Sequence, residues 1–383
     1  MMRARCNEPH QRPTSQAFLR DARLRDVATP KAALIILVLT VFMATPALGQ
    51  GSFQLLGAPG GLRGTLVGND YVNTFGAMNA LGIGAPQTGL TLTTLSNGAL
   101  YFTPYIVQFA GLPNGHTAGL TAYVSTNFAH PSALIVQNCP DTATCTSAGG
   151  FSAMSTSAAV PSVVVPSPGI GNNVNVTGGL GIFVPDNNGA GAFSGVDNGA
   201  VITFRMTDLN TNTVVATAIF TFNATPSTQV QTAVQLTLAT AAGGLTVQPA
   251  GDYQMAFGNV NGLGIGPGAG LTTVAAAGGT IYSTPYLLQP VFSDFTSTTA
   301  TLKVFASTNF AHPTSLILED AAVATGPYAA ISIAAGAPTT MTSAAADRST
   351  ITRFLGLLVS NANGAGVFAG NDSATLTFTI TVP

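Results

Sequence analysis

The chain contains no tryptophan, little charge and few cysteines. Charged side chains make up only 7% of its 383 residues, so neutral hydroxyl and amide groups must cover most of the surface. Surfaces of that kind tend to associate rather than repel one another. Seven of the twelve basic residues lie before residue 32, which leaves five basic and eleven acidic residues in the rest of the chain. Without a basic surface, the chain is not expected to bind nucleic acid.

The order of the first 49 residues indicates a leader. A long basic segment precedes an uncharged apolar run, residues 32–48, which ends in small residues. This order is typical of a secretory signal peptide, with Ala47 and Gly49 at the small positions before a cut ahead of Gln50. We therefore expect residues 1–49 to be a signal peptide of a bacterial-type cell, and the protein to be secreted or on the cell surface, in an extracellular or periplasmic location. The alternative is an uncleaved leader that anchors the chain, its only expected contact with a membrane, although the run is marginal in length for a span.

Two of the three cysteines, Cys139 and Cys145, follow the leader. An even pair in an oxidising compartment predicts a disulfide. The bridge would close a small loop that the second copy of the repeat described below does not share. It would therefore stabilise one loop and not a core common to both copies. Two thiols without histidines nearby argue against a zinc site.

A tandem duplication organises the rest of the chain. The segment STNFAHP occurs unchanged at residues 125–131 and 307–313, a period of 182, and LGIG begins at both Leu81 and Leu263. A period this long predicts two whole domains rather than a solenoid of short units. We expect the first repeat at residues 50–223, a proline-containing linker at 224–230 and the second repeat at 231–383.

Both repeats are expected to consist of β-strands. Most segments alternate apolar and polar residues, are rich in β-branched types and break at Gly, Pro or Asn, which is typical of strands. Many short strands separated by turns predict an all-β fold of two tandem β-sandwich domains, immunoglobulin-like or jelly-roll. The expected strands are residues 53–55, 120–124, 134–136, 201–206, 214–222, 234–236, 302–306 and 375–382.

The repeated loop carries the first candidate ligand-binding residues, His130 and His312, with Asn127 and Asn309 beside them. Each histidine precedes a proline between two expected strands, which favours extended backbone and a purely structural loop. The functional interpretation is contact with a ligand. A catalytic role would need a positioned nucleophile and acid, and no such motif accompanies either histidine.

Two tyrosines give a further candidate ligand site. Tyr105 and Tyr286 follow the paired Thr-Pro steps of the two repeats and are positioned to stack on a sugar. Packing in the core or at a sheet edge is the favoured interpretation, because aromatic side chains normally supply buried area, and sugar stacking is the alternative.

An Asn-Gly segment in each repeat has partial calcium-loop spacing. The oxygen-bearing residues at its first, third and twelfth places are Asp186, Asn188 and Asp197 in repeat 1, and Asn361, Asn363 and Asp372 in repeat 2. Glycine stands at the sixth place, as in calcium loops. Ala190 and Ala365 occupy the fifth place, however, and no bidentate Glu closes either loop. An Asn-Gly turn between strands explains the same residues, so we expect no cofactor, with calcium as the alternative.

The leader, the all-β body and the lack of a catalytic motif together favour a secreted or cell-surface, non-enzymatic structural protein that self-associates or forms part of the envelope. One alternative is an adhesin or carbohydrate-binding module that uses the duplicated loops. A second alternative is a secreted hydrolase whose residues converge without a local motif.

Repeat 1 contains a strand candidate, residues 214–222, that has no counterpart in repeat 2. If this strand pairs within repeat 1, repeat 2 would expose a sheet edge, and exposed edges recruit strands from other chains. Residues 50–66 are the expected donor for head-to-tail homo-oligomers. The alternative is that residues 214–222 cross over and complete repeat 2.

The exported protein should lack residues 1–49, because the apolar run ends directly before small residues suited to processing. Intact mass spectrometry of the native protein checks this expectation. A species that still carries residues 32–48 would establish the anchor instead.

Overall fold

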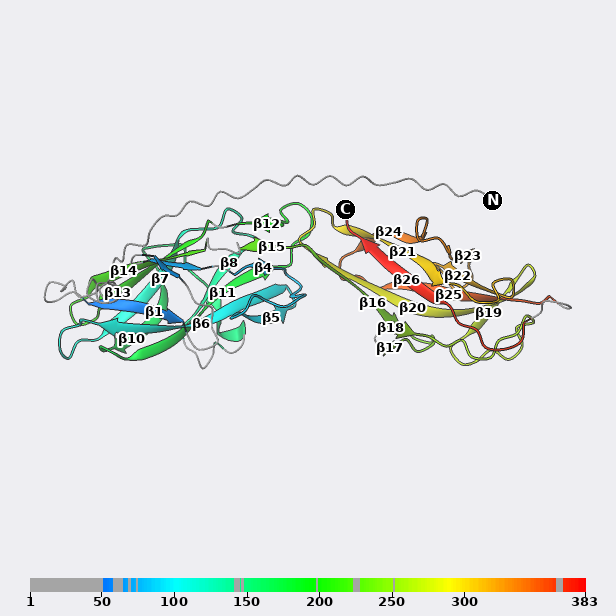
Figure 1. Cartoon of the computed structure of the whole chain (residues 1–383), viewed down its shortest axis with the longest axis horizontal. Coiled ribbons are helices and arrows are strands. Elements are labelled where there is room, and N and C mark those ends of the chain that lie inside the picture. The colour runs from blue at the N-terminus through cyan, green and yellow to red at the C-terminus, as the bar shows by residue number, and fades with distance from the viewer. Residues whose placement is uncertain are drawn as a thin grey trace, which may run out of the picture. The chain divides into compact units, whose positions relative to one another are not determined.

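Strands form nearly all the regular structure of the computed structural model (Figure 1). Residues 1–50, which include the predicted leader, lie outside the described part of the chain, as do residues 224–227 of the predicted linker. The described part has one short 3-10 helix, η2 (Ala148–Gly150), and no helix in it is long and apolar enough to cross a membrane. The structure describes residues 51–57, 65–67, 70–73, 75–140, 145, 148–197, 199–222, 228–250, 252–362 and 368–383.

The first half of the described chain, residues 51–230, holds two large sheets and one small sheet. The first large sheet has the order β1-β6-β11-β8-β9, with β5 also paired to β6, and the second has the order β10-β7-β13-β14-β3-β2. The small sheet is β12-β15-β4. Their strands are β1 (Ser52–Gly57), β2 (Thr65–Val67), β3 (Asp70–Asn73), β4 (Ala77–Met78), β5 (Thr91–Leu95), β6 (Gly98–Ala110), β7 (Ala118–Thr126), β8 (Ile135–Cys139), β9 (Ser152–Ala153), β10 (Ser162–Ile170), β11 (Asn175–Pro185), β12 (Gly195–Val196), β13 (Val201–Asp208), β14 (Thr213–Phe222) and β15 (Gln229–Val230).

The second half, residues 231–383, has a sheet with the corresponding order β16-β20-β25-β22-β23, again with one further strand, β19, on the second member. Its other sheets are the three-stranded β24-β21-β26 and the ribbon β17-β18. The strands are β16 (Ala233–Thr240), β17 (Gln248–Ala250), β18 (Asp252–Gln254), β19 (Thr272–Ala276), β20 (Gly279–Ser293), β21 (Thr299–Thr308), β22 (Leu316–Ala321), β23 (Ala329–Ala330), β24 (Thr339–Ala346), β25 (Ile351–Ser360) and β26 (Thr375–Thr381).

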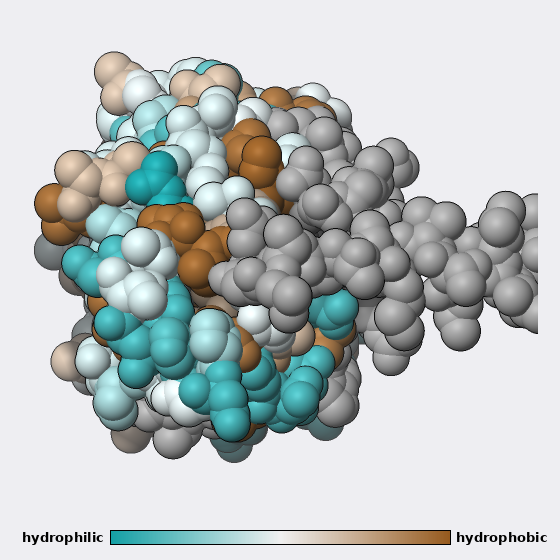
Figure 2. Space-filling view, turned by 90° about the vertical axis from the view of Figure 1, so that its left-hand side faces the viewer, coloured by the Kyte–Doolittle hydropathy of each residue, from teal (hydrophilic) through white to brown (hydrophobic). Residues whose placement is uncertain are grey.

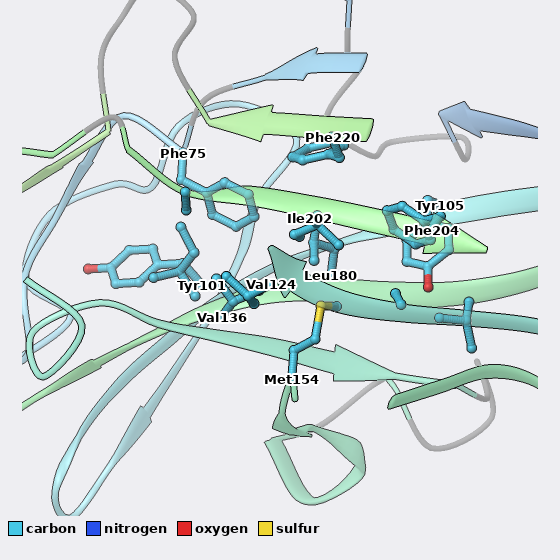
Figure 3. Packing of buried hydrophobic residues seen from close by; sticks show 14 of the residues in the cluster. Phe75, Tyr101, Tyr105, Val124, Val136, Met154, Leu180, Ile202, Phe204 and Phe220 are labelled. Carbon is cyan, nitrogen blue, oxygen red and sulfur yellow. The ribbon is translucent and has the colours of Figure 1, made fainter. Parts of the chain in front are cut away.

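Alternation along the strands creates the core of the first half. In β13, buried Ile202 and Phe204 alternate with less buried neighbours, because successive side chains of a strand point to opposite faces. Figure 3 shows these two side chains among Leu180 and Tyr105, which belong to the other large sheet. The predicted all-β sandwich is therefore confirmed. Each such side chain contributes about 1.5–3 kcal/mol to stability by its burial.

The predicted strand segments each overlap an observed strand, and the predicted disulfide is present. Cys139 lies at the end of β8 and is bonded to Cys145, with their Cα atoms 5.8 Å apart. Both cysteines are buried, although residues 141–144 between them lie outside the described part of the chain.

The end of the predicted linker belongs to a sheet of the first half. Thr228 is fully buried; its hydroxyl accepts a hydrogen bond from the Phe75 N–H, and its carbonyl accepts one from the Asp197 N–H. Gln229 and Val230 follow as β15, which pairs with β12 and β4. The Gln231 N–H also donates to the Met78 carbonyl, so the chain stays bound to the first half up to residue 231, and β16 begins at Ala233.

The extra strand of the first half pairs within that half. β14 lies antiparallel to β13 along its whole length and parallel to β3 on its other side. A short turn joins β13 to β14, in which Asn212 has a φ of 55°, a left-handed conformation that asparagine adopts more readily than most residues. The crossover of residues 214–222 into the second half is therefore wrong. The expected donor stretch is also engaged, since β1 pairs with β6 and β2 with β3.

We expect each half to fold alone, provided the first fragment keeps β15. A fragment of residues 50–231 should unfold cooperatively in urea, whereas one of residues 50–223 should be less stable. The shorter fragment leaves the buried N–H groups of Phe75 and Asp197 without Thr228, at a cost of about 1–3 kcal/mol each. Circular dichroism at increasing urea measures both. If the full chain unfolds cooperatively while residues 50–231 and 232–383 do not, the halves are not independent domains.

Candidate functional site

The repeated loop of the first half closes on an aspartate from a distant segment. This loop follows β7, and Asp197 lies four residues before β13. The Asp197 carboxylate accepts hydrogen bonds from the backbone N–H of Ala129 (3.2 Å) and His130 (2.8 Å), and its Oδ2 lies 3.0 Å from the Nδ1 of His130. The Gly199 N–H donates a fourth bond at 3.3 Å. The acceptor positions of this buried carboxylate are therefore filled by the protein itself.

A phenylalanine fixes the plane of the histidine ring. Phe193 stacks on His130 with ring centroids 3.6 Å apart and an interplanar angle of 11°. The side chain of Asp197 is 2% exposed, whereas that of His130 is 47% exposed. The buried carboxylate thus contacts the Nδ1 edge of the imidazole, and the Phe193 ring covers one of its faces. The rest of the imidazole is accessible. We call such a set a His–Asp–Phe cluster.

The second half contains the same cluster, made by His312, Asp372 and Phe368. Asp372 Oδ2 lies 2.9 Å from His312 Nδ1, and the carboxylate accepts from the N–H groups of Ala311 and His312 at 3.1 and 3.0 Å. The rings of His312 and Phe368 lie 3.8 Å apart at 14°. The sequence patterns pointed to the histidines and to Asp197 and Asp372 for different reasons, and the structure brings them together.

Electrostatics favour the ionised form of both aspartates. Burial opposes ionisation of Asp372, but hydrogen bonds from the His312 side chain and from neighbouring backbone N–H groups outweigh it and lower its pKa to about 2. The same balance lowers the pKa of Asp197, where the donors are the His130 backbone and imidazole and the N–H groups of Ala129 and Gly199. Each carboxylate is therefore a stable hydrogen-bond acceptor at neutral pH.

The geometry resembles part of a catalytic triad but supplies only its orienting members. An aspartate at Nδ1 fixes the tautomer and orientation of a histidine, and catalysis then needs a nucleophile at Nε2. In both clusters the described hydrogen bonds of the imidazole run through Nδ1 to the aspartate. The bonds from the backbone N–H groups of each histidine and of the alanine before it instead close the loop against the segment that leads into β13 or β26.

The residues with calcium-loop spacing are engaged separately. Asp186 forms an ion pair with Arg348, and Asn188 donates from Nδ2 to the Phe292 carbonyl. Asp197 and Asp372 serve the two clusters, and Asn363 lies outside the described residues. The Asn361 N–H donates to the Gly278 carbonyl. Within the described ranges, no group of three or more His, Cys, Asp or Glu residues is arranged to hold a metal ion.

The tyrosines predicted as a sugar platform are core residues. Tyr105 is 9% exposed and donates its hydroxyl to Asn138 Oδ1, and Tyr286 is 2% exposed. Each packs edge-on against a phenylalanine of the facing sheet, Tyr105 against Phe204 (Figure 3) and Tyr286 against Phe378. Burial raises the pKa of both hydroxyls. The burial of both rings agrees with core packing, the favoured interpretation of these tyrosines.

The asparagines of the repeated loop act locally. The side-chain oxygen of Asn127 accepts from the N–H of Phe128, and that of Asn309 accepts from the N–H of Phe310, both at 2.9 Å. These bonds shape the turn that leads to each histidine.

A second repeated polar cluster was missed by the sequence reasoning. Asn79 binds the backbone of Ile83 through both ends of its amide, and the Tyr101 hydroxyl bonds the Asn79 N–H and carbonyl. Asn261 and Tyr282 make the same contacts in the second half. The sequence does contain a signal for this cluster. The asparagine and the tyrosine of each pair recur at about the same spacing, one before and one after the repeated LGIG segment.

Comparisons with known proteins give no family for the chain. No protein-family model matches it, and neither does any curated protein. Among solved structures, the CupB6 tip adhesin from Pseudomonas aeruginosa is 10% identical, over 87% of this chain and 96% of that one, with a TM-score of 0.28. A chaperone–tip adhesin complex of CFA/I fimbriae is 12% identical, with coverage of 88% and 86% and a TM-score of 0.20. The C-terminal domain of BspA, an AgI/II polypeptide of Streptococcus agalactiae, is 10% identical, with coverage of 79% and 95% and a TM-score of 0.17.

The two clusters predict a stability that falls in acid. An aspartate whose folded pKa is depressed contributes stability above its unfolded pKa of about 3.9, and this contribution is lost as the pH falls through the folded value. For Asp372 the window runs from about 3.9 down to about 2. The variant Asp197→Asn/Asp372→Asn should lower the melting temperature at pH 7 by several degrees and flatten its decline in this window. Thermal unfolding followed by circular dichroism at each pH measures both effects.

The matched control is Asp252→Asn, which removes an exposed carboxylate from β18. It should keep the profile of the unaltered protein. An unchanged profile in the cluster variant would show that the clusters do not stabilise the fold.

Proposed function

We propose that this protein is a non-enzymatic structural component of the cell surface or the extracellular space. The proposal rests on the contacts that the repeated histidine makes in both halves. In both halves the one residue most suggestive of chemistry is held by a buried aspartate that also binds the loop backbone. Such an arrangement stabilises a connection between strands, which is what a structural protein requires at each repeat.

The surface supports this interpretation. Among the described residues of the face in Figure 2, pale and teal ones predominate, and hydrophobic ones lie in small separate patches. A surface of neutral polar groups suits a protein that resides among other molecules of an envelope without strong electrostatic repulsion. The disulfide Cys139–Cys145 agrees with an oxidising location outside the cytoplasm.

One observation favours a second candidate function, ligand binding by the clusters. His130 and His312 are 47% and 46% exposed, although each is fixed in orientation. A rigid and accessible imidazole is suited to contact a ligand at low entropic cost. Carbohydrate is the ligand class of this alternative, which retains the adhesin interpretation of the duplicated loops.

Fractionation of the native cell tests the proposed location. Antibody detection should find the protein in the envelope or the medium, and electron microscopy with immunogold should place it outside the cytoplasm. Recovery of the protein in the cytoplasmic fraction of intact cells would refute the proposal.

Glycan-array binding distinguishes the two candidate functions. The structural proposal predicts no saturable signal for the unaltered protein, whereas the alternative predicts one that His130→Ala/His312→Ala removes. His116→Ala is the matched control, because His116 also pairs with an aspartate, Asp208, but outside the repeated loops. Turnover of a panel of ester, peptide and glycoside substrates, lost in the double variant alone, would instead establish a hydrolase.

A further inference from the structure

Two segments that are far apart in the sequence lie side by side. Residues 186–189, which follow β11, contact residues 292–295 at the end of β20. The Asp294 N–H donates to the Asn187 carbonyl at 2.8 Å, and Asn188 bonds the backbone of residues 292 and 295 through both ends of its amide. The two segments belong to the same compact unit of the chain. We call this contact the junction.

The carboxylate of Asp294 is enclosed in the junction without a hydrogen-bond partner. Asp294 is 3% exposed, and neither its Oδ1 nor its Oδ2 accepts a hydrogen bond within the described part of the chain. The Ser293 hydroxyl and the Ala80 backbone lie near enough to lower its pKa, but they do not reach hydrogen-bond geometry. Buried carboxylates are normally paired or bound to a metal ion, so Asp294 needs a partner that the described residues do not supply.

Two further oxygen atoms of the junction are also buried and unpartnered, Asp186 Oδ1 and Ser293 Oγ. The side chain of Asp186 is 6% exposed, and Ser293 is fully buried. The junction thus holds four of the six buried side-chain atoms that lack a partner among the described residues, and all four are oxygens. Unpaired buried groups that gather in one place indicate a bound water molecule or ion.

The charge of the junction favours a cation over a water molecule. Burial and the nearby charge of Asp186 raise the pKa of Asp294 to about 7, which shows that its negative charge is not compensated. Asp347 is coupled to Asp186 as well, and Arg348 supplies one positive charge by pairing with both of them. When all are ionised, these three carboxylates and one guanidinium leave an excess of two negative charges. A divalent cation neutralises that excess, and water does not.

We propose that the junction binds a calcium ion through Asp186 Oδ1, the Asp294 carboxylate and Ser293 Oγ. Calcium takes about six to eight oxygen ligands in flexible geometry, and water completes the set where protein oxygens are fewer. A donor set of oxygens without nitrogen or sulfur suits such a hard cation. The site uses two carboxylates, so it is not one of the clusters of three or more acidic, histidine or cysteine residues that the described ranges lack.

This site differs from the calcium loop considered from the sequence. Asp186 is common to both, but Asp294 and Ser293 come from the other half of the chain and were not marked by any spacing. Asn361, at the position of Asp186 in the second repeat, carries no charge, so we expect one calcium ion per chain. The ion would bridge the two halves. The site goes beyond the proposed function and does not depend on the location of the protein.

Calcium binding to the full exported chain tests the site. Titration calorimetry of the chelator-treated protein at pH 8, up to about 10 mM calcium chloride, should show one site per chain, because calcium sites of extracellular modules have dissociation constants of about 0.1–1 mM. Saturating calcium should raise the melting temperature by several degrees, since it binds the folded state. An equal rise with magnesium chloride, or with sodium chloride of the same ionic strength, would overturn the assignment to calcium.

Asp294→Asn and Asp186→Asn should each remove the calcium-dependent rise. In the presence of chelator, Asp294→Asn should melt at a higher temperature than the unaltered protein, because it removes a buried charge that has no partner. A purely structural role of Asp294 predicts the opposite, a lower melting temperature with and without calcium. The matched control is Asp252→Asn, which removes an exposed carboxylate from β18 and should keep the full rise.

The absence of both binding heat and a melting-temperature rise in the unaltered protein would overturn the proposal, whatever the variants do. A calcium-dependent rise that persists in Asp294→Asn would also overturn it. Neither result bears on the proposed function, which fractionation of the native cell tests separately.

Discussion

A strand in the interior of a sandwich needs backbone partners on both sides, because an unpaired buried N–H or carbonyl group costs as much as a lost hydrogen bond. The central strands β6, β11 and β13 of the first half meet this requirement by pairing with other strands on both sides. The requirement also explains why the first half has β14, which pairs with the second side of β13 and adds Phe220 to the core. In the second half β20, β25 and β21 have partners on both sides, and among the described strands β26 pairs with β21.

Connections between the paired strands depend on neutral and singly charged hydrogen-bond acceptors rather than on networks of ion pairs. With 7% charged residues, the chain has few ion pairs to form. Asp197 and Asn79 instead bind several backbone groups each, and both do so at points where a loop returns to the sheet. A charge-assisted bond to a backbone N–H contributes more than a neutral one, so a single buried aspartate stabilises a loop that would otherwise need several weaker contacts.

The fold class, strand positions and disulfide could be predicted from the sequence because they depend on local pattern and composition. The clusters could not, since their bonds join residues far apart in the sequence: His130 and Asp197 are separated by 67 positions. The sequence marked both residues but placed them in two unrelated loops: His130 in a structural loop with ligand contact as the alternative, and Asp197 in an Asn-Gly turn segment with calcium as the alternative. Tyr105 and Tyr286 show a related limit, because alternation indicates that a residue faces one side of a sheet but does not say which side is covered. Only the facing phenylalanines, Phe204 and Phe378, decide that question.

The position of the cluster in the second half links these features. Asp372 lies three residues before β26 and binds the loop that directly follows β21, so the cluster fixes the start of β26 against the end of its one described neighbour. In the first half, Asp197 contributes less to the position of the strand, because β13 is also paired with β14. In the second half the strand depends on β21 and on the cluster for its place in the sheet.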